Sequence, residues 1–330
     1  MRAYVIRRLL LIIPTLLLVT IIIFFLARMI PGDVIDIMLA EQPIKEYKID
    51  EKGKRVGVGE FTRADIEHAL GLDVPIHVQY GRWLSGIITR GDLGTSLYKK
   101  TPVLDNIINK FPVSFELGLI AIVTALLIAL PVGVYSAVRQ DTIGDYLGRS
   151  FAIACIALPS FWLGTLVMVV PSIWWRWSPP MEYVSFVEDP LANLGMFIIP
   201  GIILGMVMSG TCMRMTRTMM LEVLRQDYIR TAWSKGLRER VVVMRHALKN
   251  ALIPVVTIVG LQLPVLIGGS VILEQIFCLP GIGRLLVDVI NDRDYTVLSG
   301  INLFIAALVL IINLGVDLVY GYLDPRVHYR

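Results

Sequence analysis

Six long stretches of the sequence contain no Asp, Glu, Lys or Arg. They are 19 to 26 residues long, whereas the next longest stretch of this kind, 275–283, has nine residues. A helix needs about 20 apolar residues to cross the hydrocarbon core of a bilayer. The pattern therefore predicts an all-α, multi-pass membrane protein with six spans, at residues 9–27, 117–138, 150–175, 190–213, 250–273 and 295–316.

Composition and charge indicate a membrane protein whose two termini lie in the cytoplasm. Hydrophobic residues make up 55% of the 330 residues and charged residues only 18%, with a mean hydropathy of +0.69, which excludes a soluble enzyme. With the N-terminus inside, the inner segments hold sixteen Lys and Arg residues and the short outer loops three. Cytoplasmic loops are enriched in these residues. The same bias explains the net charge of +4 without nucleic-acid binding.

The N-terminal apolar stretch is interpreted as an uncleaved first span. Its 19 residues exceed the roughly 7–15 of a signal peptide, and no small-residue cleavage site follows. The three cysteines, Cys155, Cys212 and Cys278, do not form a disulfide framework and are interpreted as unpaired thiols.

A long segment, 31–112, separates the first two spans on the predicted outer side. Its part 41–60 is rich in Lys, Glu and Gly, so we expect a loop or short hairpin there. A capping-box pattern at 62–65 predicts a short helix that ends at Leu70. A second helix is expected from Pro75 to the glycine turn at 91–94. Its apolar face would lie on the membrane surface or on the ends of the spans, and comprises Ile76, Tyr80, Trp83, Leu84 and Ile87.

The inner loop 214–249 is long and basic, with nine Lys and Arg residues. Good helix formers occupy 221–235, and Gly236 follows them. Glycine suits the left-handed residue that closes one helix before another begins. Apolar residues then recur at helical spacing, at Leu237, Val241, Met244 and Leu248. The pattern predicts a cytoplasmic helix–turn–helix hairpin over 221–250; a basic surface helix that binds anionic lipid is the alternative.

Several chemistries have no signature in the sequence. There is no G-x-x-x-x-G-K-[ST] phosphate loop, no G-x-S-x-G or H-E-x-x-H motif, and no metal-ligand spacing among the four histidines. The uncharged stretches also lack the buried ionisable groups on which ion-coupled transporters depend. We therefore expect a non-catalytic chain without a bound metal or cofactor, and any pumping energy must come from a partner.

A few polar residues and glycines in or near the spans have two interpretations each. Asn313 and Asp317, near the inner end of the last span, and Glu116, at the outer start of the second, either line a path or pin a neighbouring helix, or simply lie at the membrane interface. Gly201 and Gly205 form a G-x-x-x-G pair that permits close helix packing.

Glycine and proline also punctuate the later spans. Gly268 and Gly269 precede the run Pro280-Gly281-Ile282-Gly283, which predicts a sharp outer turn that is either a gate or docking surface or a plain connector. Prolines that would kink the spans lie at Pro131, Pro159, Pro200, Pro254 and Pro264.

The inner loop closely resembles the EAA loop of ABC-importer permeases. The resemblance rests on Tyr228-Ile229-Arg230-Thr231-Ala232-Trp233-Ser234-Lys235-Gly236-Leu237 and on Arg245-His246-Ala247-Leu248-Lys249-Asn250-Ala251-Leu252-Ile253-Pro254. Within these permeases, the sequence most closely resembles the "B" subunit of the dipeptide/oligopeptide/nickel group. Agreeing motifs run from end to end of the chain, among them Arg28-Met29-Ile30-Pro31-Gly32-Asp33, Gly91-Asp92-Leu93-Gly94, Pro280-Gly281-Ile282-Gly283-Arg284 and Asp324-Pro325-Arg326. Two features depart from the general pattern: Arg230-Thr231-Ala232 stands where it has Glu-Ala-Ala, and 42–60 is longer and more charged than usual.

The resemblance implies the type I ABC-importer permease fold in a bacterial or archaeal cytoplasmic membrane. It divides the chain into a tip with the first span (1–30), a mixed extracytoplasmic segment (31–112), a five-helix core (113–322) and a cytoplasmic tail (323–330). The implied partners are a similar second permease, two cytoplasmic ATPase subunits that carry ATP and Mg, an extracytoplasmic substrate-binding protein and membrane lipid.

The resemblance also makes the hairpin the ATPase-docking element. Gly236 would supply the turn, apolar residues close contact, and basic residues charge pairs to the partner. The implied docking set is Arg230, Thr231, Ala232, Ser234, Lys235, Gly236, Leu237, Arg238 and Arg240.

The predicted function is therefore that of a translocation subunit that imports di- or oligopeptides by alternating access. The same family importing nickel, glutathione or another small solute is one alternative. An ATPase-independent channel or scaffold is a second, but such a protein does not need the hairpin.

Overall fold

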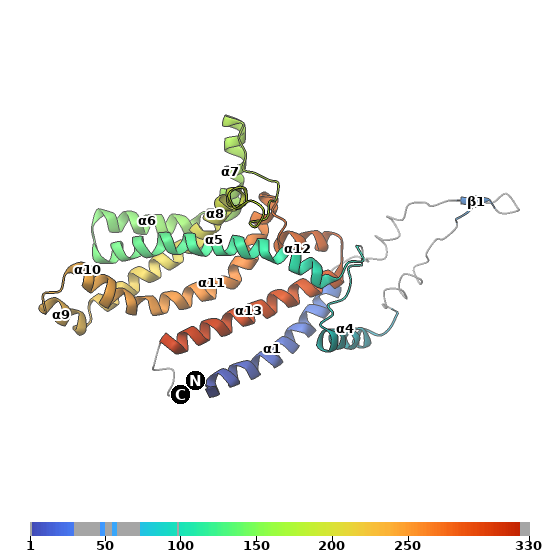
Figure 1. Ribbon diagram of the computed structural model, residues 1–330, viewed down its shortest axis with the longest axis horizontal. Coiled ribbons are helices and arrows are strands. Elements are labelled where there is room, and N and C mark those ends of the chain that lie inside the picture. Colours follow the sequence, from blue (N-terminus) through green and yellow to red (C-terminus); the bar gives the residue numbers. More distant parts are fainter. Residues whose placement is uncertain (1, 30–46, 50–54, 58–72, 98, 324–330) are drawn as a thin grey trace. The chain divides into compact units, whose positions relative to one another are not determined.

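The computed structural model describes residues 2–29, 47–49, 55–57, 73–97 and 99–323, which are predominantly helical (Figure 1). They divide between two compact units. The first comprises Met1–Ile12, Lys110–Leu285 and Ala307–Arg330, and the second comprises Ile13–Asn109 and Leu286–Ala306.

The elements follow one another along the chain and are named as in Figure 1. The helices are α1 (Arg2–Met29), α4 (Ile76–Arg90), α5 (Val103–Val138), α6 (Ile143–Ala157), α7 (Ser160–Trp175), α8 (Pro190–Leu224), α9 (Asp227–Ser234), α10 (Glu239–Val241), the π-helix η1 (Val242–Ala247), α11 (Leu248–Ile276), α12 (Ile282–Asn291) and α13 (Tyr295–Leu323). The strands are β1 (Tyr47–Ile49) and β2 (Arg55–Gly57).

Each of the six predicted spans falls on helical residues, but not every helix is long and apolar enough to cross a bilayer. Among the described residues, four helical segments are long and apolar enough to cross it: Val103–Val138, Pro190–Leu224, Glu239–Pro264 and Tyr295–Val319. The pair α6 and α7 passes the same test only when taken together, and Leu10–Leu26 of α1 is a shorter apolar helix. By length and composition, the described residues therefore contain four candidate spans, or five if the pair counts as one span.

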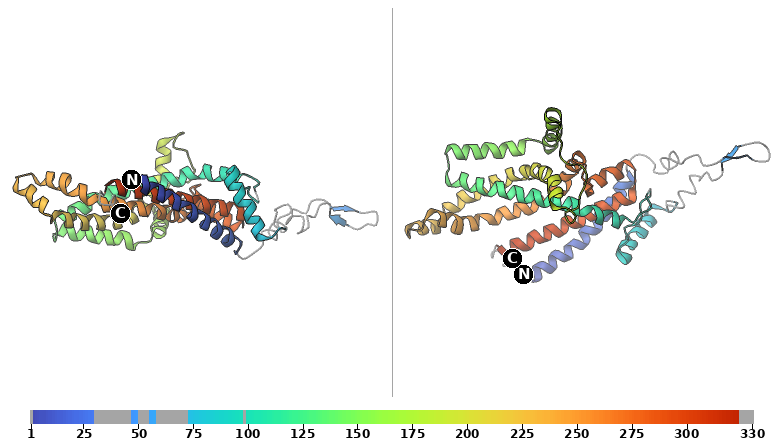
Figure 2. Two further views of the ribbon diagram at one scale, coloured as in Figure 1. Left: turned by 90° about the horizontal axis from the view of Figure 1, so that it is seen from below. Right: turned by 45° about the horizontal axis from the view of Figure 1, so that its top comes forward.

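The third predicted span is not continuous, which corrects the expectation of one helix over 150–175. α6 ends at Ala157 and α7 begins at Ser160, and the two axes meet at 89° (Figure 2). Leu158 and Pro159 both have extended backbones. Proline disfavours a helical residue before it and cannot donate an amide hydrogen bond, so the break falls at Pro159.

The core of the first unit lies where α5, α8 and α11 pack together (Figure 1). Every fourth residue on one face of α5 is fully buried, and all but one of these are small: Leu117, Ala121, Ala125 and Ala129. On α8, a Cβ at Gly205 would lie 2.6 Å from the carbonyl oxygen of Ala121. A Cβ at Gly201 would clash with the side chain of Ile120. The G-x-x-x-G pair thus lets α8 approach the backbone of α5.

In the second unit, the predicted amphipathic helix packs on α1. α4 begins after Pro75 and is capped by Gly91, at the start of the predicted glycine turn; Gly91 has a left-handed backbone with φ 64°. The rings of Tyr80 and Trp83 lie 5.3 and 5.5 Å from the ring of Phe24, and the Tyr80 hydroxyl lies 2.9 Å from the Thr20 hydroxyl. The apolar face of α4 therefore lies against α1, the helix that contains the first predicted span.

The remaining outer-segment predictions meet the structure only in part. β1 and β2 pair antiparallel, with Lys48 opposite Val56, inside the stretch for which we expected a loop or short hairpin. The predicted helix over 62–70 lies outside the described residues. Farther along, buried Asp294 accepts hydrogen bonds from the Ser96 hydroxyl (2.6 Å) and the Leu97 amide (3.0 Å), which fixes the loop after α4 to the start of α13.

Candidate functional site

The first arm of the hairpin is two helices rather than one. α8 ends at Leu224, and α9 begins at Asp227, so the prediction of a single helix through 221–235 was wrong. Gln226 has φ −72° and ψ 149°, an extended conformation that takes the chain out of the helix. This corner turns α9 so that Ile229 and Ala232 are buried, 0% and 6% exposed.

The turn at Gly236 is the predicted left-handed helix end. Gly236 has φ +73°, its amide donates to the Trp233 carbonyl (2.9 Å), and the Leu237 amide donates to the Ala232 carbonyl (3.4 Å). These two bonds define a Schellman motif, which satisfies the last carbonyls of the helix. Leu237 packs against the cluster that contains Ala232, as such caps commonly require.

The second arm buries only part of the predicted face, because Leu237 and Leu248 pack against the cluster that contains Ala232 but Val241 and Met244 do not. Val242, Val243, Ala247 and Ala251 are buried, whereas Val241 and Met244 are exposed. The segment forms one turn of π-helix, η1, instead of regular α-helix. Wider π-helical turns shift the residues that follow around the axis, so spacing rules for an α-helix selected the wrong side chains.

A compact apolar cluster holds both arms to the ends of α5 and α8. Ile229 and Ala232 of α9 share it with Met220 of α8, Ala137 of α5, and the buried residues of the second arm. At its edge, the Asn250 side-chain amide donates to the Tyr228 hydroxyl at 2.7 Å. The hairpin is therefore packed onto the helices that carry it.

The other face of the hairpin is exposed and basic. Ala232 is buried and Leu237 half-buried, so both make contacts within the hairpin's own cluster. Trp233, which sequence reasoning did not select, is 45% exposed; its only signal was that two polar residues follow it. The remaining predicted docking residues are all exposed: Arg230, Thr231, Ser234, Lys235, Gly236, Arg238 and Arg240.

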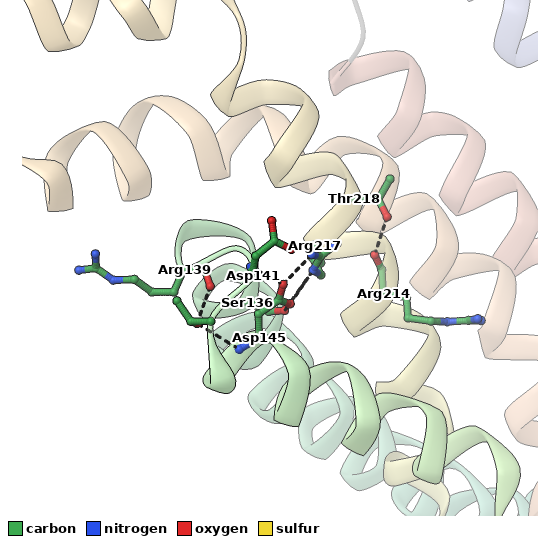
Figure 3. Close-up of polar contacts among 8 residues, drawn as sticks. Ser136, Arg139, Asp141, Asp145, Arg214, Arg217 and Thr218 are labelled. Atoms are coloured by element: carbon green, nitrogen blue, oxygen red, sulfur yellow. Dashed lines mark hydrogen bonds and ion pairs between the residues drawn. The ribbon is translucent and has the colours of Figure 1, made fainter.

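An ion pair that the sequence analysis missed fastens α6 to α8 beside the hairpin (Figure 3). Asp145 is 0% exposed, and Arg217 donates to it twice, from Nε to Oδ1 at 2.8 Å and from Nη2 to Oδ2 at 2.7 Å. Ser136 of α5 also donates to Asp145, and the Asp141 amide donates at 3.1 Å. Three helices thus meet at one carboxylate. The only sequence signal for Asp145 was its capping-box spacing from Thr142. The structure shows the corresponding cap, in which the Asp145 amide donates to the Thr142 hydroxyl.

The polar residues that we considered for a path lie at two separate places in the first unit. Asp317 of α13 forms an ion pair with Arg8 of α1, 2.9 Å between Oδ2 and Nη1, and Asn313 is half-buried. Glu116 accepts a hydrogen bond from the Asn193 side-chain amide at 3.3 Å. Both carboxylates therefore join two segments of the chain. No group of three or more metal-ligating side chains occurs in the described part of the chain.

Comparisons with known proteins place this chain among transport proteins. Residues 129–329 match the family described as binding-protein-dependent transport system inner membrane component, and residues 1–118 match the N-terminal region of such membrane components. The chain is 36% identical to the dipeptide transport system permease protein DppB of Escherichia coli (strain K12) and 38% identical to the protein of that name from Alkalihalophilus pseudofirmus. It is 40% identical to a putative peptide transport system permease protein of Brucella suis biovar 1. All three matches cover both chains completely.

Among solved structures, the fold resembles a chain of the MetNI methionine ABC transporter in an inward-facing conformation. The TM-score is 0.53 at 16% identity, and the match covers 67% of this chain and 97% of the other. The likeness is one of fold.

Proposed function

This chain belongs to the family of binding-protein-dependent transport system inner membrane components and is thus the non-catalytic permease subunit of an ABC importer; from that premise we propose that it imports di- or oligopeptides. The peptide permeases to which it is 36–40% identical along its whole length support this cargo. Nickel, glutathione or another small solute is the alternative cargo.

The proposed subunit crosses the inner membrane six times with both termini in the cytoplasm. The sixteen Lys and Arg residues in the inner segments, against three in the short outer loops, support this orientation. α1 would supply the first span, and the bent pair α6–α7 would supply the third. The exposed hairpin around Gly236 then lies in the cytoplasm, and the turn between α11 and α12 lies outside.

The proposed partners divide the work of transport. Two cytoplasmic ATPase subunits bind ATP and Mg, a second permease completes the path, and an extracytoplasmic binding protein delivers the substrate. Lys235, Arg238 and Arg240 lie on the exposed face of the hairpin, where they can pair with acidic groups of an ATPase subunit. Residues that meet a partner at a charged rim set its orientation and association rate.

The observation that carries this proposal is the way the hairpin is built. An exposed, basic, Schellman-capped turn stands on a buried cluster, and the ion pair of Asp145 and Arg217 fastens the adjoining helices. A movement imposed on the turn would pass to α5, α6 and α8 instead of bending the loop, because packed cores rearrange between discrete states and do not deform freely. An ATPase-independent channel or scaffold has no use for this element.

The test is a mild-detergent purification of the tagged chain expressed with its native gene neighbours. We expect a second permease and ATPase subunits to co-purify, and ATP hydrolysis to rise when peptide and its binding protein are added. A complex that forms but ignores peptides would reject the peptide cargo and bring nickel and glutathione forward. A chain that purifies alone would reject the coupling role of the hairpin.

A further inference from the structure

A carboxylate lies fully buried at the predicted outer end of α11. Glu274 is 0% exposed. Its Oε1 accepts hydrogen bonds from the hydroxyls of Ser114 (2.7 Å) and Ser270 (2.9 Å), and its Oε2 accepts one from the amide of Arg284 (2.9 Å). A buried charge is tolerated only when several donors compensate for the lost water. Glu274 has three, and they come from α5, from its own helix and from the start of α12.

The turn that follows α11 is pressed onto this carboxylate. A Cβ at Gly281 would lie 2.5 Å from Cδ of Glu274 and 2.6 Å from Oγ of Ser114, and a Cβ at Gly283 would lie 2.9 Å from Oε2 of Glu274. Only glycine permits this approach. The amide of Ile282 also donates to Oγ of Ser114 at 2.8 Å. Ser114 thus accepts from the turn while it donates to Glu274.

Glu274, Ser114 and the turn 277–284 together form what we call the outer latch. Its apolar side chains are as deeply buried as its carboxylate: Phe277, Leu279 and Ile282 are at most 2% exposed. A fully satisfied buried network is rigid, whereas one that lacks a partner leaves a costly unpaired group. The latch is therefore expected to be either fully closed or open, as a gate requires.

We propose that Glu274 is a positioning residue for transport, which holds the turn 277–284 on α5 and keeps the outer ends of α5 and α11 closed until substrate is delivered. This inference rests on the proposed function and its orientation. When the complex turns outward-facing, the bonds of Glu274 and Ser114 to the turn must break. Weakening them would favour the outward-facing state without substrate, so ATP would be spent without uptake.

The two serines provide a matched test, because both donate to the same oxygen of Glu274. Ser270 lies one turn away on the same helix, and without it Oε1 keeps its bond from Ser114. Ser114 is the donor from α5, and it also accepts from the Ile282 amide of the turn. In the complex reconstituted in vesicles, we expect Ser114→Ala and Glu274→Gln to raise ATP hydrolysis without binding protein at least three-fold and to lower peptide uptake per ATP at least three-fold. Ser270→Ala should stay within two-fold of the wild type in both assays.

Equal effects of Ser114→Ala and Ser270→Ala would overturn the latch, since a purely structural network predicts no difference between them. Lowered ATP hydrolysis together with lowered uptake in Ser114→Ala would also overturn it. If the wild-type complex itself shows neither uptake nor stimulation by the binding protein, the proposed function fails instead.

A reversible crosslink separates a holding role from a chemical role of the carboxylate. With Glu274→Ala to make room and Cys278→Ser to remove the neighbouring thiol, cysteines in place of Ser114 and Gly281 are close enough to bond. Oxidation should return the raised ATP hydrolysis to within two-fold of the wild type, and reduction should raise it again. A crosslink confirmed by mass spectrometry that leaves the hydrolysis unchanged would overturn the proposal.

Discussion

Gly236 and Cys278 occupy the same position in two equivalent helix ends. Each is the left-handed residue of a Schellman motif, with φ of 73° and 55°. At the first, the Leu237 amide donates to the Ala232 carbonyl; at the second, the Leu279 amide donates to the Glu274 carbonyl at 2.9 Å. Glycine adopts this backbone without strain, whereas a residue with a Cβ pays roughly 1–2 kcal/mol. The two positions therefore respond to substitution in opposite ways.

At Gly236, a β-branched residue should uncouple transport while membrane insertion stays normal. No atom lies within 4 Å of the Cβ position, so Gly236→Val acts through the backbone alone. A strain of roughly 1–2 kcal/mol shifts the balance between the closed and the open turn about 5–30-fold. We expect peptide uptake in cells to fall several-fold at an unchanged level of the chain in membranes.

Gly236→Asn is the matched control, because asparagine tolerates left-handed backbone. It should keep most of the uptake. Normal uptake by Gly236→Val at a normal membrane level would contradict the role of the turn.

At Cys278, the opposite change should stabilise the protein. Cys278→Gly removes the strain of the Cβ, and the gain is offset by the entropy that glycine loses on folding, about 0.5–1 kcal/mol. The expected net gain is up to about 1 kcal/mol, visible as a higher melting temperature in detergent. Cys278→Ala keeps the Cβ and should show no gain. A melting temperature that rises equally in both variants would assign the effect to loss of the thiol.

Breaking the ion pair between Asp145 and Arg217 should be strongly destabilising. Removing one partner of a buried pair typically costs about 3–5 kcal/mol because the other charge stays unpaired. Asp145→Ala should therefore lower the melting temperature of the purified complex and its yield. The exposed pair of Arg139 and Glu239, 3.7 Å apart, is the control. Glu239→Gln should change stability by less than about 1 kcal/mol. Similar losses of stability in both variants would contradict a larger contribution from the buried pair.

The contact between α5 and α8 can be tested with two glycines on one helix. A methyl group at Gly205 would lie 2.6 Å from the Ala121 carbonyl oxygen and 2.8 Å from Cβ of Thr124, whereas nothing lies within 4 Å of the Cβ position of Gly195. Gly205→Ala should force the helices apart and cost about 1–3 kcal/mol, as overpacking does. Gly195→Ala should be neutral or slightly stabilising. Thermal unfolding in detergent measures both, and an unchanged melting temperature for Gly205→Ala would contradict the close packing.

Local features of the protein could be read from the sequence because their causes are local. Charge-free stretches located the apolar helices, since about 20 apolar residues are needed to cross a bilayer. Gly236 and Gly91 marked helix ends, since few other residues adopt a left-handed backbone easily. The basic face of the hairpin was predicted from the nine Lys and Arg residues of the inner loop 214–249. The pattern failed at the π-helical turn of η1, where Val242 and Val243 are buried in place of Val241 and Met244, because α-helical spacing does not apply there.

Tertiary structure alone decided which polar residues matter. Glu274 directly follows an uncharged stretch, and nothing in the sequence indicated that it is buried; its donor Ser114 lies 160 residues away. Asp145 carried only a capping-box signal, and its partner Arg217 lies 72 residues away. A carboxylate is buried or exposed according to the donors that surround it in space. The sequence therefore determined where the apolar helices lie and that Gly91 and Gly236 end helices, and packing determined where the other helices break and which charges hold them together.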